Sequence, residues 1–148
     1  MYTNTLIKIF TRDLNKLKEE IELYNKESNL WVLDKSITNC AGNLCLHLIG
    51  NLNYFIGSIL GNTGYVRQRE LEFSLKNEPR ARMLKEIDDT ILVVEKTLSK
   101  LGSDDLDALY PIEVFKEPMI TEYFLTHLVH HLSYHLGQIN YHRRLLDV

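Results

Sequence analysis

Histidine is the residue type in this sequence best suited to chemistry, and five of the six histidines lie in one short segment, THLVHHLSYHLGQINYH, residues 126–142. Imidazole binds divalent metals and transfers protons near neutral pH. His131 and His135 stand four positions apart, so on a helix both rings lie on one face, one turn apart. This spacing alone leaves two interpretations open: a metal site, or solvated histidines on a helix surface.

A helix over residues 119–146 places these histidines unequally around its axis. At about 100° per residue, one apolar face contains Leu125, Leu128, Leu132, Leu136 and Ile139. His135 and His142 lie beside one edge of this face, and His131 lies slightly further round. We expect His127 and His142 at the surface near the rim of a pocket, and His130 on the side that faces away from the core.

The sixth histidine, His47 in LCLHLIGNLNYF, flanks the apolar face of another predicted helix. If the two helices are neighbours, their polar flanks meet, and His47, His131 and His135 converge. Three neutral imidazoles hold a divalent ion and leave positions for water or substrate, which is typical of catalytic rather than structural metal sites. The alternative is that the histidines only satisfy polar packing.

Four segments with helical period must position these residues: residues 3–24, 36–60, 79–101 and 119–146. They predict a single all-α domain, residues 1–148, with an antiparallel four-helix bundle as the expected architecture. Residues 65–78 are interpreted as a charged connection. The segment LDALYPIEVFKEP, residues 106–118, allows a short hairpin between the third and fourth helices, although its two prolines disfavour strand pairing.

Composition and charge exclude several classes of function. A net charge of −3 without a cluster of Lys and Arg argues against nucleic-acid binding. We expect no membrane span and no signal peptide, since no apolar run is long enough. Cys40 and Cys45 point about 140° apart on a helix and do not bridge, which favours a reduced cytoplasmic protein. Expected partners are a small-molecule substrate and a second copy of the chain in a homodimer.

Three segments resemble the DinB/YfiT superfamily of metal-binding four-helix bundles: LHLIGNL (46–52), GYVRQRELEF (64–73) and HHLSYHLGQI (130–139). The resemblance implies that His47, His131 and His135 hold zinc, nickel or a similar ion. It also implies an activity, because relatives with an assigned reaction include transferases and isomerases that use a low-molecular-weight thiol. Leu136 stands where the superfamily more often has arginine, which changes the expected substrate contacts.

The expected function is therefore a metal-dependent transferase that activates a low-molecular-weight thiol; the alternative is a non-catalytic stress protein that binds metal or a small ligand. Candidate catalytic residues are Asn51, Tyr54 and Gln138, each of which could instead make a structural hydrogen bond. A carboxylate from Glu70 or Glu72, or a backbone carbonyl, could orient a ligand ring. Arg67 and Arg69 are expected in a solvated loop rather than on an anionic thiol.

Overall fold

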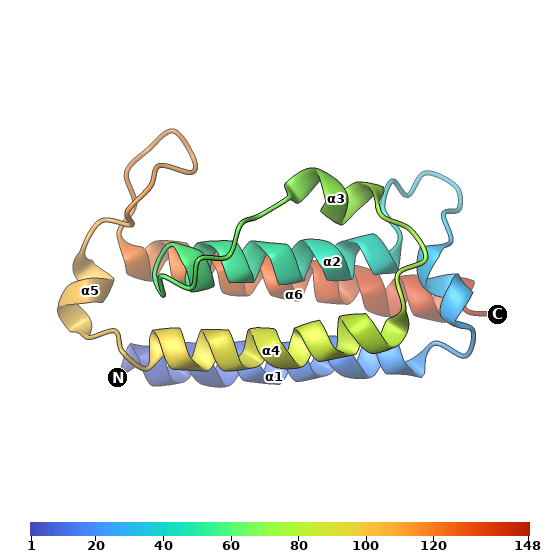
Figure 1. Ribbon diagram of the computed structural model, residues 1–148, viewed down its shortest axis with the longest axis horizontal. Helices are drawn as coiled ribbons and strands as arrows, with labels where there is room; N and C mark the ends of the chain where they lie inside the picture. The colour runs from blue at the N-terminus through green and yellow to red at the C-terminus, as the bar shows by residue number, and fades with distance from the viewer.

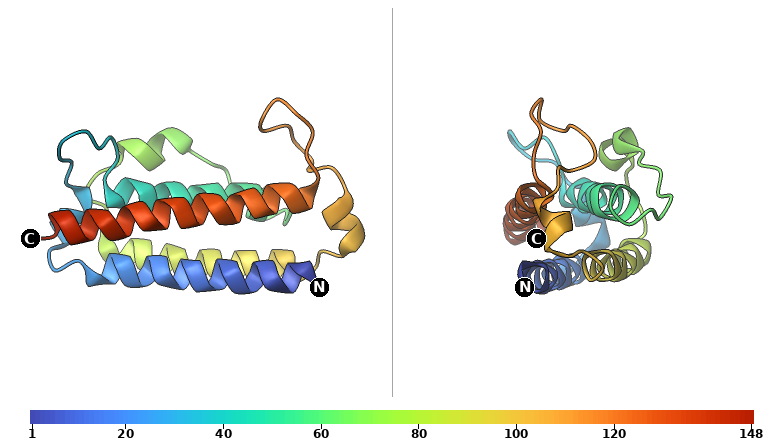
Figure 2. Two further views of the ribbon diagram at one scale, coloured as in Figure 1. Left: turned by 180° about the vertical axis from the view of Figure 1, so that it is seen from behind. Right: turned by 90° about the vertical axis from the view of Figure 1, so that its left-hand side faces the viewer.

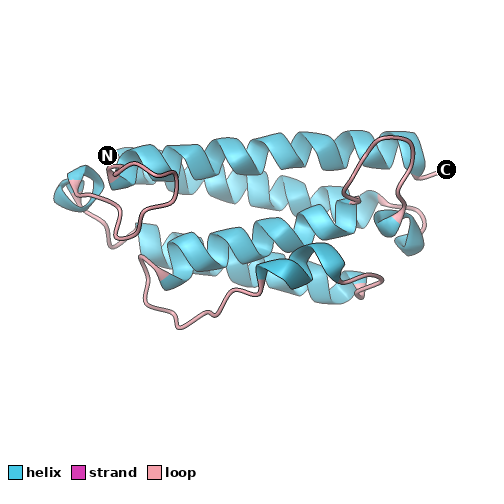
Figure 3. Ribbon diagram, turned by 90° about the horizontal axis from the view of Figure 1, so that it is seen from above, coloured by secondary structure: helices cyan, strands magenta, loops and turns pink.

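The structure is a computed structural model that describes residues 1–148, and it is all-helical, as the sequence predicted. Figure 3 shows helices and loops without a strand. The α-helices are α1 (Tyr2–Leu23), α2 (Ala41–Leu52), α3 (Arg69–Ser74), α4 (Arg80–Leu98), α5 (Ser103–Asp107) and α6 (Thr121–Leu146). A 3-10 helix, η1 (Glu27–Trp31), follows α1, and a π-helix, η2 (Asn53–Ser58), continues α2.

The four long helices, α1, α2, α4 and α6, lie side by side in two layers (Figures 1 and 2). One layer contains α1 and α4, and the other contains α2 and α6. Their inward faces carry the predicted apolar stripes, so the core runs along the full length of the helices. The stripe of α1 shows this well, because Phe10, Leu14, Leu17 and Ile21 have no exposed surface.

The two helices within each layer run in opposite directions, whereas helices that face each other across the layers run in the same direction. Helices α1 and α6 run in the same direction. Tyr2 hydrogen-bonds Thr126 near the start of both helices. The α1 C-cap Tyr24 likewise hydrogen-bonds His142 near the end of α6. Helices α1 and α4 run in opposite directions, as do α2 and α6 (Figure 1).

The connection from α2 to α4 explains this mixed order. Residues 59–79 run back along the length of the molecule and carry α3 over α2 (Figure 1), so α4 starts at the same end as α2 and runs parallel to it. The antiparallel order expected from sequence therefore applies to two neighbouring pairs but not to the other two. Helix α3 lies within the segment that the sequence suggested was only a charged connection.

Local structure departs from the predicted boundaries in two further places. The second long helix was expected from residue 36, but it begins at Ala41 with Cys40 as its N-cap. Both cysteines are free, as expected from their spacing, and both are buried. Between α4 and α6 the expected hairpin is only a single β-bridge, Leu109 with Ile120, because Pro111 and Pro118 interrupt any longer ladder.

None of the helices combines the length and the apolar character that a membrane crossing requires.

Candidate metal centre

Three histidines from two helices converge at one point, as the sequence predicted. His47 on α2 places its Nε2 atom 3.1 Å from Nε2 of His131 on α6. The His135 ring centre lies 5.3 Å from that of His47 and 4.6 Å from that of His131. Each residue can offer one ligand atom such that all three atoms lie within 4.8 Å of one another. A single divalent ion fits three imidazole donors at this separation.

Helix packing brings the three rings together. His131 and His135 are one turn apart on the same face of α6, and α2 packs antiparallel against that face. His47 lies opposite His131. Eight residues further along the chain, in η2, the ring of Phe55 lies 5.0 Å from that of Phe124 on α6. All of α2 is buried, so His47 is 6% exposed although it flanks the apolar face.

A buried ion pair from the α2–α4 connection holds His47. Glu72 on α3 accepts a hydrogen bond from His47 Nδ1 at 3.0 Å. Arg67 donates to both carboxylate oxygens of Glu72, each at 2.9 Å, and its guanidinium lies 5.6 Å from the centre of the Phe55 ring. The connection therefore forms a strap over the histidine.

The charge of Glu72 fixes which nitrogen of His47 carries its proton. Burial raises the pKa of this carboxyl, but hydrogen bonds from His47 and Arg67 outweigh that effect, and the pKa lies below its ordinary value. An ionised carboxylate only accepts hydrogen bonds, so His47 Nδ1 bears the hydrogen. Nε2 of His47 then presents a lone pair towards the other two rings, as a metal ligand must.

Gly50 provides the space that Glu72 occupies. A Cβ atom added at this position would collide with Oε2 of Glu72. Because Gly50 lies on α2 three residues after His47, only a residue without a side chain lets the carboxylate reach past the helix to the imidazole.

The second histidine of the cluster, His135, also has a hydrogen-bond partner outside the cluster. Its Nδ1 donates to Oε1 of Gln138 at 2.7 Å, within the same helix. Burial lowers the pKa of His135, and the hydrogen bond to Gln138 offsets only part of this effect. The ring is therefore neutral at pH 7, with Nε2 available as a ligand.

The third histidine of the cluster, His131, has a strongly lowered pKa. Burial, with further contributions from the neighbouring His135 and His47, lowers its pKa to about 3. Its Nδ1 is buried and has no hydrogen-bond partner. A neutral imidazole ligates a cation without first releasing a proton, so a low pKa favours metal binding at neutral pH.

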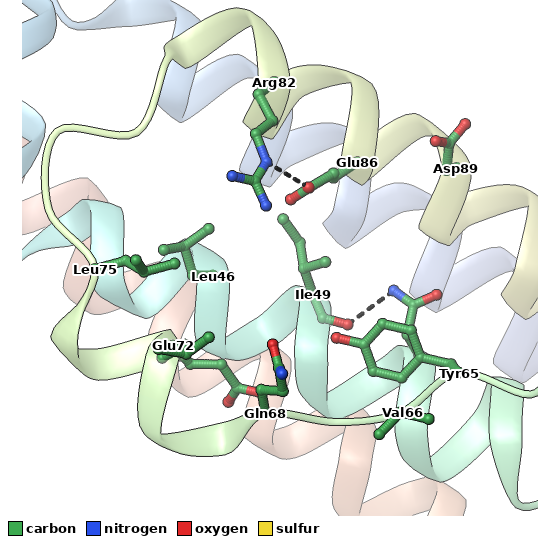
Figure 4. A pocket seen from close by; sticks show the side chains of 12 residues that line it. Leu46, Ile49, Tyr65, Val66, Gln68, Glu72, Leu75, Arg82, Glu86 and Asp89 are labelled. Carbon is green, nitrogen blue, oxygen red and sulfur yellow. Dashed lines mark hydrogen bonds and ion pairs between the residues drawn. The ribbon is translucent and has the colours of Figure 1, made fainter.

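Two cavities are lined by residues of this region. One, of about 740 Å³, opens beside His135: this histidine and Gln138 line it together with Tyr134, Tyr141 and the loop of residues 34–39. The other, of about 390 Å³, lies between α2, α3 and α4, and Glu72 forms part of its wall (Figure 4). Figure 4 shows the hydrogen-bonded pair Arg82 and Glu86 on the α4 side of this second cavity. Only the first cavity contains a histidine of the triad among its lining residues.

The remaining candidate residues, catalytic or orienting, differ in their burial and contacts. Asn51 is buried one turn beyond His47, and its Oδ1 has no partner. Gln138 hydrogen-bonds His135, one of the three converging histidines. Tyr54 packs its ring against Phe55 at 5.0 Å and makes no contact with the triad. Of the two glutamates left open by the sequence, Glu72 is buried and Glu70 is exposed.

Two expectations about charged and polar residues were wrong. Arg67 is not in a solvated loop, because Glu72 pairs with it and only 11% of its side chain is exposed. His142 is not at the surface: its Nδ1 accepts from the Tyr24 hydroxyl at 2.7 Å, and its Nε2 donates to the Val32 carbonyl at 2.8 Å. Arg67 is mostly covered because Glu72, five residues further on, pairs with it. His142 is buried because distant segments satisfy both of its ring nitrogens, which a helical wheel does not reveal.

The expectations for the other residues hold more closely. Arg69 is exposed, over the ring of Phe73. His130 is exposed, and His127 is half-buried with its ring centre 4.8 Å from that of Phe115.

Comparison with known families gives one match. The profile of the family described as "Protein of unknown function (DUF1572)" matches residues 1–147. Comparison with curated proteins finds no match.

Proposed function

This chain belongs to the DUF1572 family, and from the geometry of its histidine centre we propose that it is a divalent-metal-dependent enzyme, a transferase that activates a low-molecular-weight thiol. The observation that carries the proposal is the convergence of His47, His131 and His135 with their ligand atoms within 4.8 Å of one another. Zinc and nickel are the ions that suit this donor set best.

The outer partners support ligation rather than polar packing. His47 and His135 both have Nδ1 tied to an acceptor, Glu72 and Gln138 respectively, which leaves Nε2 of each ring facing the centre. Polar packing alone would not require two rings to turn the same nitrogen inward. Carboxylate and amide acceptors of this kind orient histidine ligands in metal sites.

Three protein ligands favour catalysis over a purely structural role. A divalent ion with open positions lowers the pKa of a bound thiol or water and so yields a nucleophile at neutral pH. The protein also offers space for a substrate. His135 borders the cavity of about 740 Å³, which is large enough for a small organic molecule. Tyr134 and Tyr141 give that cavity an aromatic wall, and Lys35 places a cation at its edge.

The thiol chemistry rests on the resemblance to the DinB/YfiT superfamily. We interpret the four long helices as a four-helix bundle of that type, with α3 on the crossover connection. The segments that carry the resemblance are the ones that build the site: residues 46–52 contain His47, residues 64–73 contain Arg67 and Glu72 of the strap, and residues 130–139 contain the other two histidines.

Elemental analysis of the untagged protein tests the proposal. We expect close to one equivalent of zinc or nickel in the wild-type protein, and loss of the metal in both His47→Ala and His135→Ala. His130→Ala, a change at an exposed histidine of the same helix, is the matched control and should keep the metal. A wild-type protein that takes up no metal after incubation with zinc would overturn the proposal.

A further inference from the structure

The outer face of α6 differs in composition from the outer face of α4. The exposed residues of α4 are mostly charged, and they include Arg82, Lys85, Asp88, Asp89 and Lys96. The exposed residues of α6 are Tyr123, His130, Ser133, Tyr134, Gly137, Gln138, Tyr141, Arg144 and Leu145. Only Arg144 among them is charged. Because the solvent-facing side of a bundle helix normally carries charged residues, the outer face of α6 has the composition of a surface that packs against a partner.

The large exposed residues of this face lie on one line along the helix. At about 100° per residue, the side chains of Tyr123, Tyr134, Tyr141 and Leu145 fall within about 40° of one direction. Each of the four is between 62% and 69% exposed. In the view from behind the molecule, no other helix lies in front of α6 (Figure 2). We call these four residues, together with Gly137, the tyrosine stripe.

Gly137 lies within the stripe, about one turn from Tyr134 and from Tyr141. A glycine inside a helix costs about 1 kcal/mol relative to alanine, so it usually has a packing reason. At the glycines of α2 and η2 that reason lies within the chain, because a Cβ atom added there would collide with a side chain. Nothing lies within 4 Å of a Cβ atom added at Gly137. The gap between the two tyrosines is therefore open to a side chain of a partner.

A second copy of the same chain fits the stripe, because the stripe is symmetric about its centre. Tyr134 is eleven residues from both Tyr123 and Leu145. If two α6 helices pack antiparallel about a twofold axis at Tyr134, then Tyr123 of one copy lies level with Leu145 of the other. Tyr134 of one copy then lies about one turn from Gly137 of the other, where the missing side chain leaves room for its ring.

Opposite charges meet on one flank of the stripe in the same arrangement. Glu122 and Arg144 lie on the flank nearer α1, as does Asn140, which hydrogen-bonds Glu20 of α1. A twofold axis brings the same flank of both helices together, and Arg144 comes level with residue 124 of the second copy, close to Glu122 of that copy. Within one chain neither Glu122 nor Arg144 forms a salt bridge. Two pairs of opposite charge then form by symmetry, which favours the antiparallel arrangement.

The exposed area of this face is close to what a dimer requires. A tyrosine side chain has about 200 Å² of surface, so the three tyrosines, each roughly two-thirds exposed, present roughly 400 Å² in each copy. Two copies cover roughly 800 Å² from these residues alone, and the other exposed residues of α6 bring the total towards the ~1,200 Å² of the smaller specific interfaces. We therefore expect a dissociation constant in the micromolar range.

We propose that the tyrosine stripe is the interface of a homodimer, in which two α6 helices pack antiparallel about a twofold axis at Tyr134. The inference goes beyond the proposed function and does not depend on it. Tyr134, Tyr141 and Leu145 also line the cavity beside His135, so the second copy borders that cavity.

Sedimentation equilibrium across micromolar concentrations tests the proposal. We expect the mass of the wild type to rise from that of one chain to twice that value as the concentration increases. Tyr134→Asp places two carboxylates at the twofold axis and should weaken dimerisation at least about 100-fold, because like charges then face each other in the interface. Leu92→Asp is the matched control, since Leu92 is 63% exposed on α4, and it should dimerise like the wild type.

Reversal of charges tests the antiparallel arrangement itself. Arg144→Glu and Glu122→Arg should each weaken dimerisation about 3–10-fold, because like charges then meet on the flank of the stripe. The double variant should recover the wild-type dissociation constant, since it restores two pairs of opposite charge. A double variant that is weaker than both single variants would overturn this arrangement.

Two further outcomes contradict the proposal. A wild type that stays monomeric over the whole concentration range would overturn it and leave the exposed tyrosines as a wall of the small-molecule cavity alone. A dissociation constant that is the same in Tyr134→Asp and wild type would overturn it as well, because the interface would then lie on another face. Circular dichroism of each variant checks that the helices remain.

Discussion

Glu72 and His47 are 25 positions apart and belong to different helices, yet Oε1 of the glutamate lies 3.0 Å from Nδ1 of the histidine, with both side chains 7% exposed. This contact links the crossover connection to the three-histidine cluster. It makes the orientation of His47 depend on a segment that contributes no histidine to that cluster.

Glu72→Gln should weaken zinc binding by about 10–100-fold, because an amide is a poorer acceptor for His47 Nδ1 and no longer neutralises Arg67. Competition with a chelator measures the change, and circular dichroism checks that the helices remain. Glu70→Gln is the control, since Glu70 lies two residues away and is exposed. Equal zinc affinity of Glu72→Gln and wild type would show that this carboxylate does not orient the ligand.

Gly50→Ala should cause the same loss of zinc affinity as Glu72→Gln, although it replaces no polar side chain. The new methyl group would occupy the position of the Glu72 carboxylate and push it away from His47. The effects of Gly50→Ala and Glu72→Gln should not add in the double variant, because both remove the same contact.

Gly137→Ala is the matched control for Gly50→Ala. Nothing lies within 4 Å of a Cβ atom added at Gly137 on α6. This variant should keep zinc affinity and gain up to about 1 kcal/mol of stability from the better helix propensity of alanine. Loss of zinc in Gly137→Ala but not in Gly50→Ala would contradict the role assigned to Gly50.

The metal-free protein should lose stability as the pH falls below about 6.5. His131 has a pKa of about 3 in the folded protein and an ordinary value of 6.5 in the unfolded chain. Between these values the unfolded chain binds more protons, so acid favours unfolding, and this share of the stability is fully present only above pH 6.5. Urea unfolding at pH 7.5 and pH 5, with chelator present, measures the effect. The free energy of unfolding of His131→Asn should differ less between the two pH values than that of the wild type. An unchanged difference would argue against the lowered pKa of His131.

A small thiol should bind the metal directly. Adding cysteine to the cobalt-substituted protein is expected to produce an intense thiolate-to-cobalt charge-transfer band. Cobalt-loaded His130→Ala should show the same band, because that residue is exposed and outside the triad. A protein that binds cobalt but develops no band would favour the non-catalytic binding protein over the thiol transferase.

Tyr24→Phe should destabilise the protein by about 1–3 kcal/mol, because Nδ1 of His142 would lose its donor inside the core. Nε2 of His142 keeps its hydrogen for the Val32 carbonyl, so a change of tautomer does not compensate. Chemical denaturation measures the change. Zinc affinity should stay at the wild-type value, since His142 is not among the three converging histidines; a loss of zinc would connect this pair to the site.

The apolar period of the sequence was sufficient to predict the four long helices and the all-α class, because burial of one face imposes spacings of three and four on any amphipathic helix. The same reasoning placed His47 and the pair His131 and His135 on flanks that can meet. Helix α3 was missed because six residues at the surface carry too short a pattern to show a period.

The sequence by itself determined which residues can ligate a metal, since that follows from side-chain chemistry and from spacing within one helix. Only the tertiary structure decided what surrounds them. The reversal of the chain through residues 59–79 brings Glu72 and Arg67 to His47, and the end of α1 brings Tyr24 to His142. Such contacts join residues far apart in the chain, and a helical period records which face is buried but not which partner covers it.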